Sequence, residues 1–206
     1  LTPDCFKEFV RQFRFLSKEE SFEPFLAQLN NFDFTEVESI DLSNKALSSN
    51  ETIKILNVLK NKNALIKMLN LENNRINETM ELSFPNSLQS LDLRGNNIGD
   101  EGAQGLTLPD NLQSLNLGGN NIGDEGAQGL KFPDGLQSLD LSANSIGVAG
   151  AQGLKLPNSL QFLDLSNNYG LGVQELILPG KLQSLKLSGN HIGPLGAQRL
   201  KLPDGL

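Results

Sequence analysis

The sequence predicts an α/β fold: a solenoid in which each repeat adds one short parallel strand and one helix, behind an N-terminal helical cap. The first observation is an internal repeat. The hexapeptide LQSLDL at residues 88–93 returns with at most one substitution at Leu112, Leu136, Leu160 and Leu182, in steps of 24, 24, 24 and 22 residues. The second observation is that leucine alternates with polar residues inside each copy, which is typical of a strand with one buried face.

The repeat extends beyond the strand and can be followed along most of the chain. Each copy continues to an asparagine and usually an isoleucine, which gives the pattern L-x-x-L-x-L-x-x-N-x-I. Two degenerate copies come earlier, starting at Ile66 and at Val37, and in the first of all Lys45 takes the asparagine place. Seven repeats therefore fill residues 37–206. Because Leu206 would be the first core residue of an eighth strand, we expect the array to continue beyond it.

Residues 1–36 lack the repeat and are expected to form the N-terminal helical cap. Apolar residues recur there at helical spacing, at Phe6, Phe9, Val10 and Phe13 and at Phe22, Phe25, Leu26 and Leu29. Residues 17–20 (SKEE) have the form of a capping box. We expect the phenylalanines to cover the open end of the first repeat, because a solenoid needs a cap for solubility. An alternative is an adaptor-binding motif similar to the F-box, suggested by Leu1, Pro3 and Phe6, although the segment is short and lacks Trp.

The segment after the strand carries a resemblance to a known family. Residues 97–106 and 121–130 share the sequence NIGDEGAQGL. The repeats resemble the leucine-rich-repeat family, and these segments resemble its ribonuclease-inhibitor-like subclass. The resemblance implies a right-handed horseshoe-shaped solenoid with its parallel strands on the concave face. Only the first repeat has the length usual in that subclass, so the helices after Leu71 should have two turns or fewer.

The resemblance also implies an asparagine ladder, in which each side-chain amide satisfies buried backbone groups of its own turn and of the neighbouring coil. Its members would be Asn74, Asn96, Asn120, Asn144, Asn168 and Asn190. Asp100 and Asp124 stand where helix N-caps belong. Gly102 and Gly105 each lower helix propensity by about 1 kcal/mol relative to alanine. Either tight packing requires small residues there, or the segment is barely helical.

The residue types leave little room for catalysis. The single histidine, His191, stands where sister repeats have Asn, Ser or Tyr, so it should be an exposed, variable residue. The single cysteine, Cys5, allows neither an intrachain disulfide nor a multi-cysteine zinc site, and it favours a reducing compartment such as the cytoplasm. We therefore expect no catalytic residue, no metal, no cofactor and no small-molecule substrate.

The charge and hydropathy of the chain narrow the class of partner. The net charge of −7 argues against nucleic acid and anionic membrane surfaces, because both require clustered Lys and Arg. No apolar run approaches the roughly 18 residues of a membrane span, so membrane insertion is not expected. With nucleic acid and membranes disfavoured, we expect the partner to be a protein.

A protein partner would bind on the outward side of the strands, which is mostly small and polar. Met68 and Phe162 break a column of serines there. An exposed Phe beside charged residues is typical of a binding anchor, although single exposed apolar residues are also common on protein surfaces. The expected partner-binding residues are Phe162, Asp140, Asp164, Lys186, Met68 and Arg94.

The sequence thus favours a protein–protein interaction module that binds its partner on the concave face. Near-identical short repeats are also similar to those of leucine-rich-repeat effectors that intracellular bacteria deliver into host cells. That resemblance implies a place in the host cytoplasm. The alternative is that the array forms the substrate-recognition part of a larger enzyme, such as a ubiquitin ligase.

Overall fold

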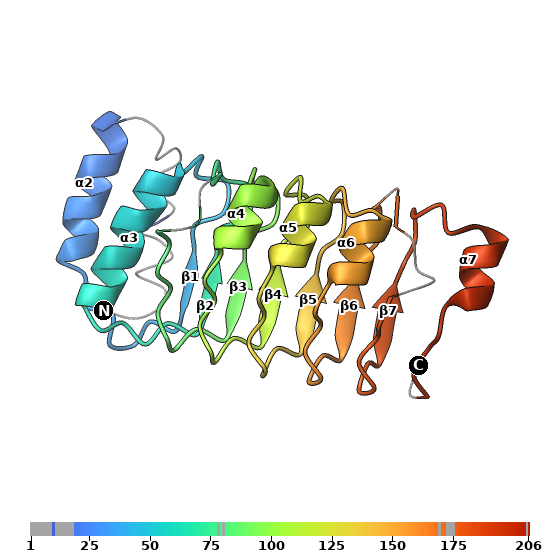
Figure 1. Ribbon diagram of the computed structural model, residues 1–206. Coiled ribbons are helices and arrows are strands. Elements are labelled where there is room, and N and C mark those ends of the chain that lie inside the picture. Colours follow the sequence, from blue (N-terminus) through green and yellow to red (C-terminus); the bar gives the residue numbers. More distant parts are fainter. Residues whose placement is uncertain are drawn as a thin grey trace.

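The structure is a computed structural model that describes residue 10 and residues 19–77, 79, 81–168, 170–171, 176–204 and 206. Most of the predicted first cap helix, the F-box-like residues, Cys5 and the start of the 17–20 capping box lie outside these residues. The described residues form one open row of coils, with a parallel sheet along one side and helices along another (Figure 1).

Each repeat contributes one strand of three residues to the seven-stranded sheet. The strands are β1 (Ser39–Asp41), β2 (Met68–Asn70), β3 (Ser90–Asp92), β4 (Ser114–Asn116), β5 (Ser138–Asp140), β6 (Phe162–Asp164) and β7 (Ser184–Lys186). Each strand pairs in parallel with the next one along the chain, and equivalent residues of successive repeats lie side by side. The middle residue is buried in β1 to β6, whereas its two neighbours point outward, as the alternating pattern predicts.

The helices shorten as the repeats shorten. They are α2 (Glu19–Asn30), α3 (Ser49–Asn61), α4 (Gly99–Gly105), α5 (Asp124–Gly129), α6 (Val148–Gly153) and α7 (Gly193–Arg199). The 29-residue first repeat holds α3 with 13 residues, whereas α4 to α7, in the later repeats, have six or seven. The longer α3 begins with a capping box, in which Ser48 Oγ accepts from the Glu51 amide and the Glu51 carboxylate accepts from the Ser48 amide.

The core is a stack of leucines with a phenylalanine cluster at the N-terminal end. The first leucine of each repeat from Leu88 to Leu182 is fully buried. At the N-terminal end, α2 packs against α3 and buries Phe22, Phe25 and Leu29. One phenylalanine stripe thus adds to the same hydrophobic core as the repeats.

The asparagines of the repeat pattern join each coil to the one before it. The Asn144 side chain accepts hydrogen bonds at 3.0 Å from the amides of Asn120 and Ile122 in the preceding coil. Its amide nitrogen donates at 3.0 Å to the carbonyls of Leu117, in the preceding coil, and Leu141, in its own. The equivalent asparagines make bonds of the same kind and are Asn74, Asn96, Asn120, Asn168 and Asn190. Each side chain satisfies buried backbone groups that no strand or helix would satisfy.

Lys45, at the asparagine place of the first repeat, has a different role. Its ammonium group donates to the Val10 carbonyl at 3.2 Å and so contacts the cap segment. Burial lowers the pKa of Lys45, while the charge of Asp41 acts in the opposite direction. The ladder of asparagines therefore begins at the second repeat, with Asn74.

The structure corrects the expected role of the two aspartates. Asp100 and Asp124 do not cap their own helices, since the N-cap residues of α4 and α5 are Ile98 and Gly123. Instead, the Asp100 carboxylate accepts from the amides of Gly123 and Gly126, at 2.6 and 3.0 Å, at the start of α5. Asp124 bonds to the start of α6 in the same way. Because successive helices lie side by side, each carboxylate reaches the unpaired amides of the next helix.

Glycines allow this close approach of the helices. A Cβ atom on Gly126 would lie 2.5 Å from the Asp100 carboxylate and 2.9 Å from the Asp100 Cα atom. A Cβ atom on Gly129 would collide with the side chain of Gln104. Tight packing, rather than absence of helical structure, therefore explains the second and third glycines of the GDEGAQG segment at residues 123–129.

We predict that Asn144→Leu lowers the free energy of unfolding by about 3 kcal/mol, because it leaves buried amides and carbonyls of two coils without partners. Urea denaturation measures the change. The control is Asn158→Leu, at an exposed position, which should alter stability by no more than about 0.5 kcal/mol. Equal unfolding midpoints for the two variants would contradict the structural role of the asparagines.

We predict that Gly126→Ala lowers the free energy of unfolding by about 1–3 kcal/mol, because the added methyl group has no space against Asp100. Thermal unfolding measures the loss. The matched control is Gly135→Ala, whose added Cβ atom would meet only the Asp110 carbonyl at 3.9 Å. If alanine is tolerated equally at both positions, the helices do not need glycine for their contact.

Candidate protein-binding surface

The outward side of the sheet offers one continuous surface across all seven repeats. We call it the strand face: the residue before each strand, the first and third residues of the strand, and the second residue after it. Its first column is mostly Gln and its second mostly Ser, and these side chains are exposed or half-buried. A surface this uniform makes the residues that depart from it easy to identify.

The third residue of each strand from β1 to β6 stabilises the turn that follows the strand. The side chains of Asp92, Asn116, Asp140 and Asp164 each accept a hydrogen bond, at 2.8–2.9 Å, from the amide two residues further along. These Asx turns redirect the chain out of the strand. The sequence analysis missed this role, although the recurrence of Asp or Asn at this position was a usable signal. One carboxylate oxygen of each Asp is committed to the turn and the other remains for a partner.

Phe162 departs most clearly from the uniform surface. It lies on β6 between Ser138 and Ser184 in the sheet register, and 47% of its surface is exposed. Serine occupies the same position in most repeats, so the fold does not require an aromatic ring there. Met68 on β2, 52% exposed, departs from the same column.

The charges near Phe162 are partly paired. Lys186 lies 3.3 Å from the carboxylate of Asp164 on the neighbouring strand. Burial acts to raise the pKa of Asp164, but hydrogen bonds from Ser166 and Lys186 outweigh it, and the pKa is lowered. Asp140, the other neighbour of Asp164, has no cation within 4 Å among the described residues.

The structure brings together four of the six expected binding residues. Phe162, Asp140, Asp164 and Lys186 share adjacent strands β5 to β7. Met68 is four strands away from Phe162, which is roughly 19 Å at the usual strand spacing. Arg94 follows β3, is exposed, and lies between these two places. A partner that contacts all six would have to extend along most of the strand face.

Three hollows among the described residues are lined by side chains of the N-terminal half of the chain. One of about 570 Å³ lies beside α3 and α4 and is lined by Ile53, Glu81 and Glu101, among others. Hollows of about 470 and 290 Å³ share Leu65, which is largely exposed. Within the described part of the chain, no three His, Cys, Asp or Glu residues are grouped to hold a metal ion. The described helices include none with the length and apolarity needed to cross a membrane.

Comparisons with known proteins agree with the architecture. A family described as leucine rich repeat matches residues 110–169, and a second family of the same description matches residues 85–106 and 181–201. Internalin C2 from Listeria monocytogenes strain 4b F2365 has a similar structure, with a TM-score of 0.53 and 23% sequence identity. That match covers 79% of this chain and 64% of the internalin chain, and it shows the fold alone. The search of curated proteins found no match. Repeat pattern, parallel sheet and family matches agree: the chain belongs to the leucine-rich-repeat family.

Proposed function

We propose that the chain is a protein-interaction module that binds a protein partner on its strand face, with Phe162 as the anchor. The observation that carries the proposal is an exposed aromatic ring at a position where the fold accepts serine. Aromatic side chains beside charged residues dominate the binding energy of many interfaces. The half-buried carboxylates of Asp140 and Asp164 would supply the polar rim.

We also propose that the partner is a host protein and that the chain acts as a bacterial effector in the host cytoplasm. The support is the similarity of its short, near-identical repeats to those of leucine-rich-repeat effectors. The alternative is that the strand face selects substrates for a larger enzyme such as a ubiquitin ligase. A reconstituted ubiquitination assay with the full-length source protein separates the two, since only the alternative requires ubiquitin transfer.

We predict that Phe162→Ser weakens partner binding by about 30-fold, the effect of losing a contact worth about 2 kcal/mol. The substitution restores the residue found in sister repeats, so the free energy of unfolding should change by no more than about 0.5 kcal/mol. Affinity purification from extracts of the source's target cells, followed by titration of the retained protein, measures the binding.

The matched control is Leu65→Ser. Leu65 is also an exposed apolar residue, 71% exposed, and serine occupies its register position at Ser87 and Ser159. It precedes β2 and lies off the strand face, so its replacement should leave binding unchanged. If Phe162→Ser retains the partner as well as Leu65→Ser does, the anchor lies elsewhere.

A further inference from the structure

We propose that the strand face takes a cationic segment of its partner, with a Lys or Arg side chain against Asp140 and an apolar side chain against Phe162. The inference rests on the proposed function, because it names the chemistry of the partner that this surface fits. Three features of the described residues support it: the position of Asp140 beside a residue without a side chain, an excess of carboxylates over cations, and the distance between Asp140 and Phe162.

Gly118, in the turn that follows β4, places no side chain next to the Asp140 carboxylate. Sister repeats carry a glutamate, an arginine or a serine at this position, such as Glu72, Arg94 and Ser142. The place of the absent Cβ atom of Gly118 lies 3.3 Å from Asp140 Oδ1, which accepts from the Ser142 amide. The other carboxylate oxygen of Asp140 is left for a partner, and an ammonium or guanidinium group carries the donors that match it.

The strand face has more carboxylates than cations. Its acidic residues are Glu38, Asp41, Glu72, Asp92, Asp140 and Asp164, and its basic residues are Lys67, Arg94 and Lys186. Two of the three cations are already paired, Lys67 with Glu38 and Lys186 with Asp164. Arg94 is therefore the one strand-face cation, among the described residues, without an ion pair to a strand-face carboxylate, against four carboxylates that have none. A partner of opposite charge would gain in both association rate and specificity.

Nearby carboxylates add to the effect of burial on the pKa of Asp92. Burial raises the pKa of Asp92, and the nearby charges of Glu72 and Asp140 raise it further, against a hydrogen bond from the Arg94 amide and the Arg94 charge. A cation that approached Asp140 would relieve part of the repulsion between these carboxylates. Arg94 lies on the β3 side of Gly118, so the incoming cation is directed to the β5 side, where Asp140 lies.

The spacing limits what the partner segment looks like. Asp140 and Phe162 lie on adjacent strands and two residues out of register, which places them roughly 7–8 Å apart. An extended chain advances about 3.3 Å per residue and points every second side chain to the same face, so the basic and apolar side chains would be two residues apart. Lys186 lies on β7, on the other side of Phe162 from Asp140, and is paired with Asp164. Its positive charge disfavours a second cation of the partner there.

The test is a selection of random twelve-residue peptides displayed on phage against the purified chain. We expect enriched peptides to carry Lys or Arg two residues from a large apolar residue. Their affinity should fall about tenfold in Asp140→Asn and more steeply in Phe162→Ser, as measured by fluorescence anisotropy. Asparagine already occupies this column at Asn70 and Asn116, so Asp140→Asn keeps the turn hydrogen bond while removing the charge.

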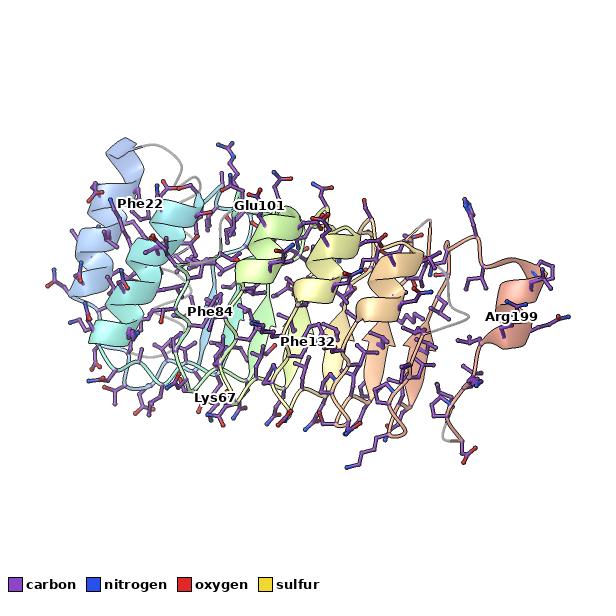
Figure 2. The ribbon with its side chains drawn as sticks, in the orientation of Figure 1. Phe22, Lys67, Phe84, Glu101, Phe132 and Arg199 are labelled. Atoms are coloured by element: carbon purple, nitrogen blue, oxygen red, sulfur yellow. The ribbon has the colours of Figure 1, made fainter. Side chains whose placement is uncertain are left out.

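The matched control is Glu101→Gln, which removes the same charge from α4. Glu101 is exposed, lines the hollow beside α3 and lies far from Lys67 of the strand face (Figure 2). Peptide binding should be unchanged in this variant. A larger loss in Glu101→Gln than in Asp140→Asn would move the cationic site to that hollow and overturn the inference.

The remaining outcomes separate the inference from the proposed function. Neutral or acidic peptides that lose affinity in Phe162→Ser would overturn the cationic partner and leave the strand face as the binding surface. Peptides that bind Phe162→Ser as tightly as the parent chain would contradict the proposed function itself. A selection that yields no peptide sensitive to Phe162 or Asp140 counts against the inference.

Discussion

The structure depends on one constraint: each coil must satisfy the backbone polar groups of its neighbour's turn. The asparagines do this with both ends of the side-chain amide, as Asn144 does for the Asn120 amide and the Leu117 carbonyl. Because these bonds and the parallel strand pairing both run from coil to coil, they fix the separation of the coils at the strand spacing, about 4.8 Å. The helices on the other side of each coil must pack closely enough to allow that pairing.

The helical side meets this constraint with small residues. Helices that pack through ordinary side chains have axes about 8–10 Å apart, which exceeds what the strands impose. Gly126 and Gly129 remove the side chains that would keep α5 away from α4, and Asp100 then reaches the amides at the start of α5. The small residues therefore let successive helices lie close enough for the strands of the same coils to stay paired. At α6 the aspartate is replaced by Val148, so this carboxylate contact is absent from that position.

The sequence predicted what depends on periodicity and missed what depends on contacts between coils. Leucine alternation placed the strands, and repeat length predicted short helices after Leu71. Asp100 was assigned to its own helix because capping rules describe one helix at a time, whereas its actual partners lie 23 and 26 residues further along. The turn role of Asp140 was missed for a different reason. Asp140 was interpreted only as an outward charge, although its carboxylate accepts a local hydrogen bond from the Ser142 amide. The capping box at Ser48 and Glu51 was visible in the sequence and was not used.

In a repeat protein, equivalent positions of sister repeats show which residues the fold accepts, so residues needed for folding can be distinguished from residues that serve binding. The fold tolerates serine at the position of Phe162 and asparagine at the position of Asp140, because sister repeats carry those residues in the same register. Folding alone therefore does not account for the aromatic ring or for the charge. The leucines and ladder asparagines offer no such freedom, since most sister repeats repeat them. Phe162 departs from the repeat while leaving its hydrogen bonds intact, so it is the strand-face residue that a binding function best explains, and the turn-forming Asp140 lies on the adjacent strand.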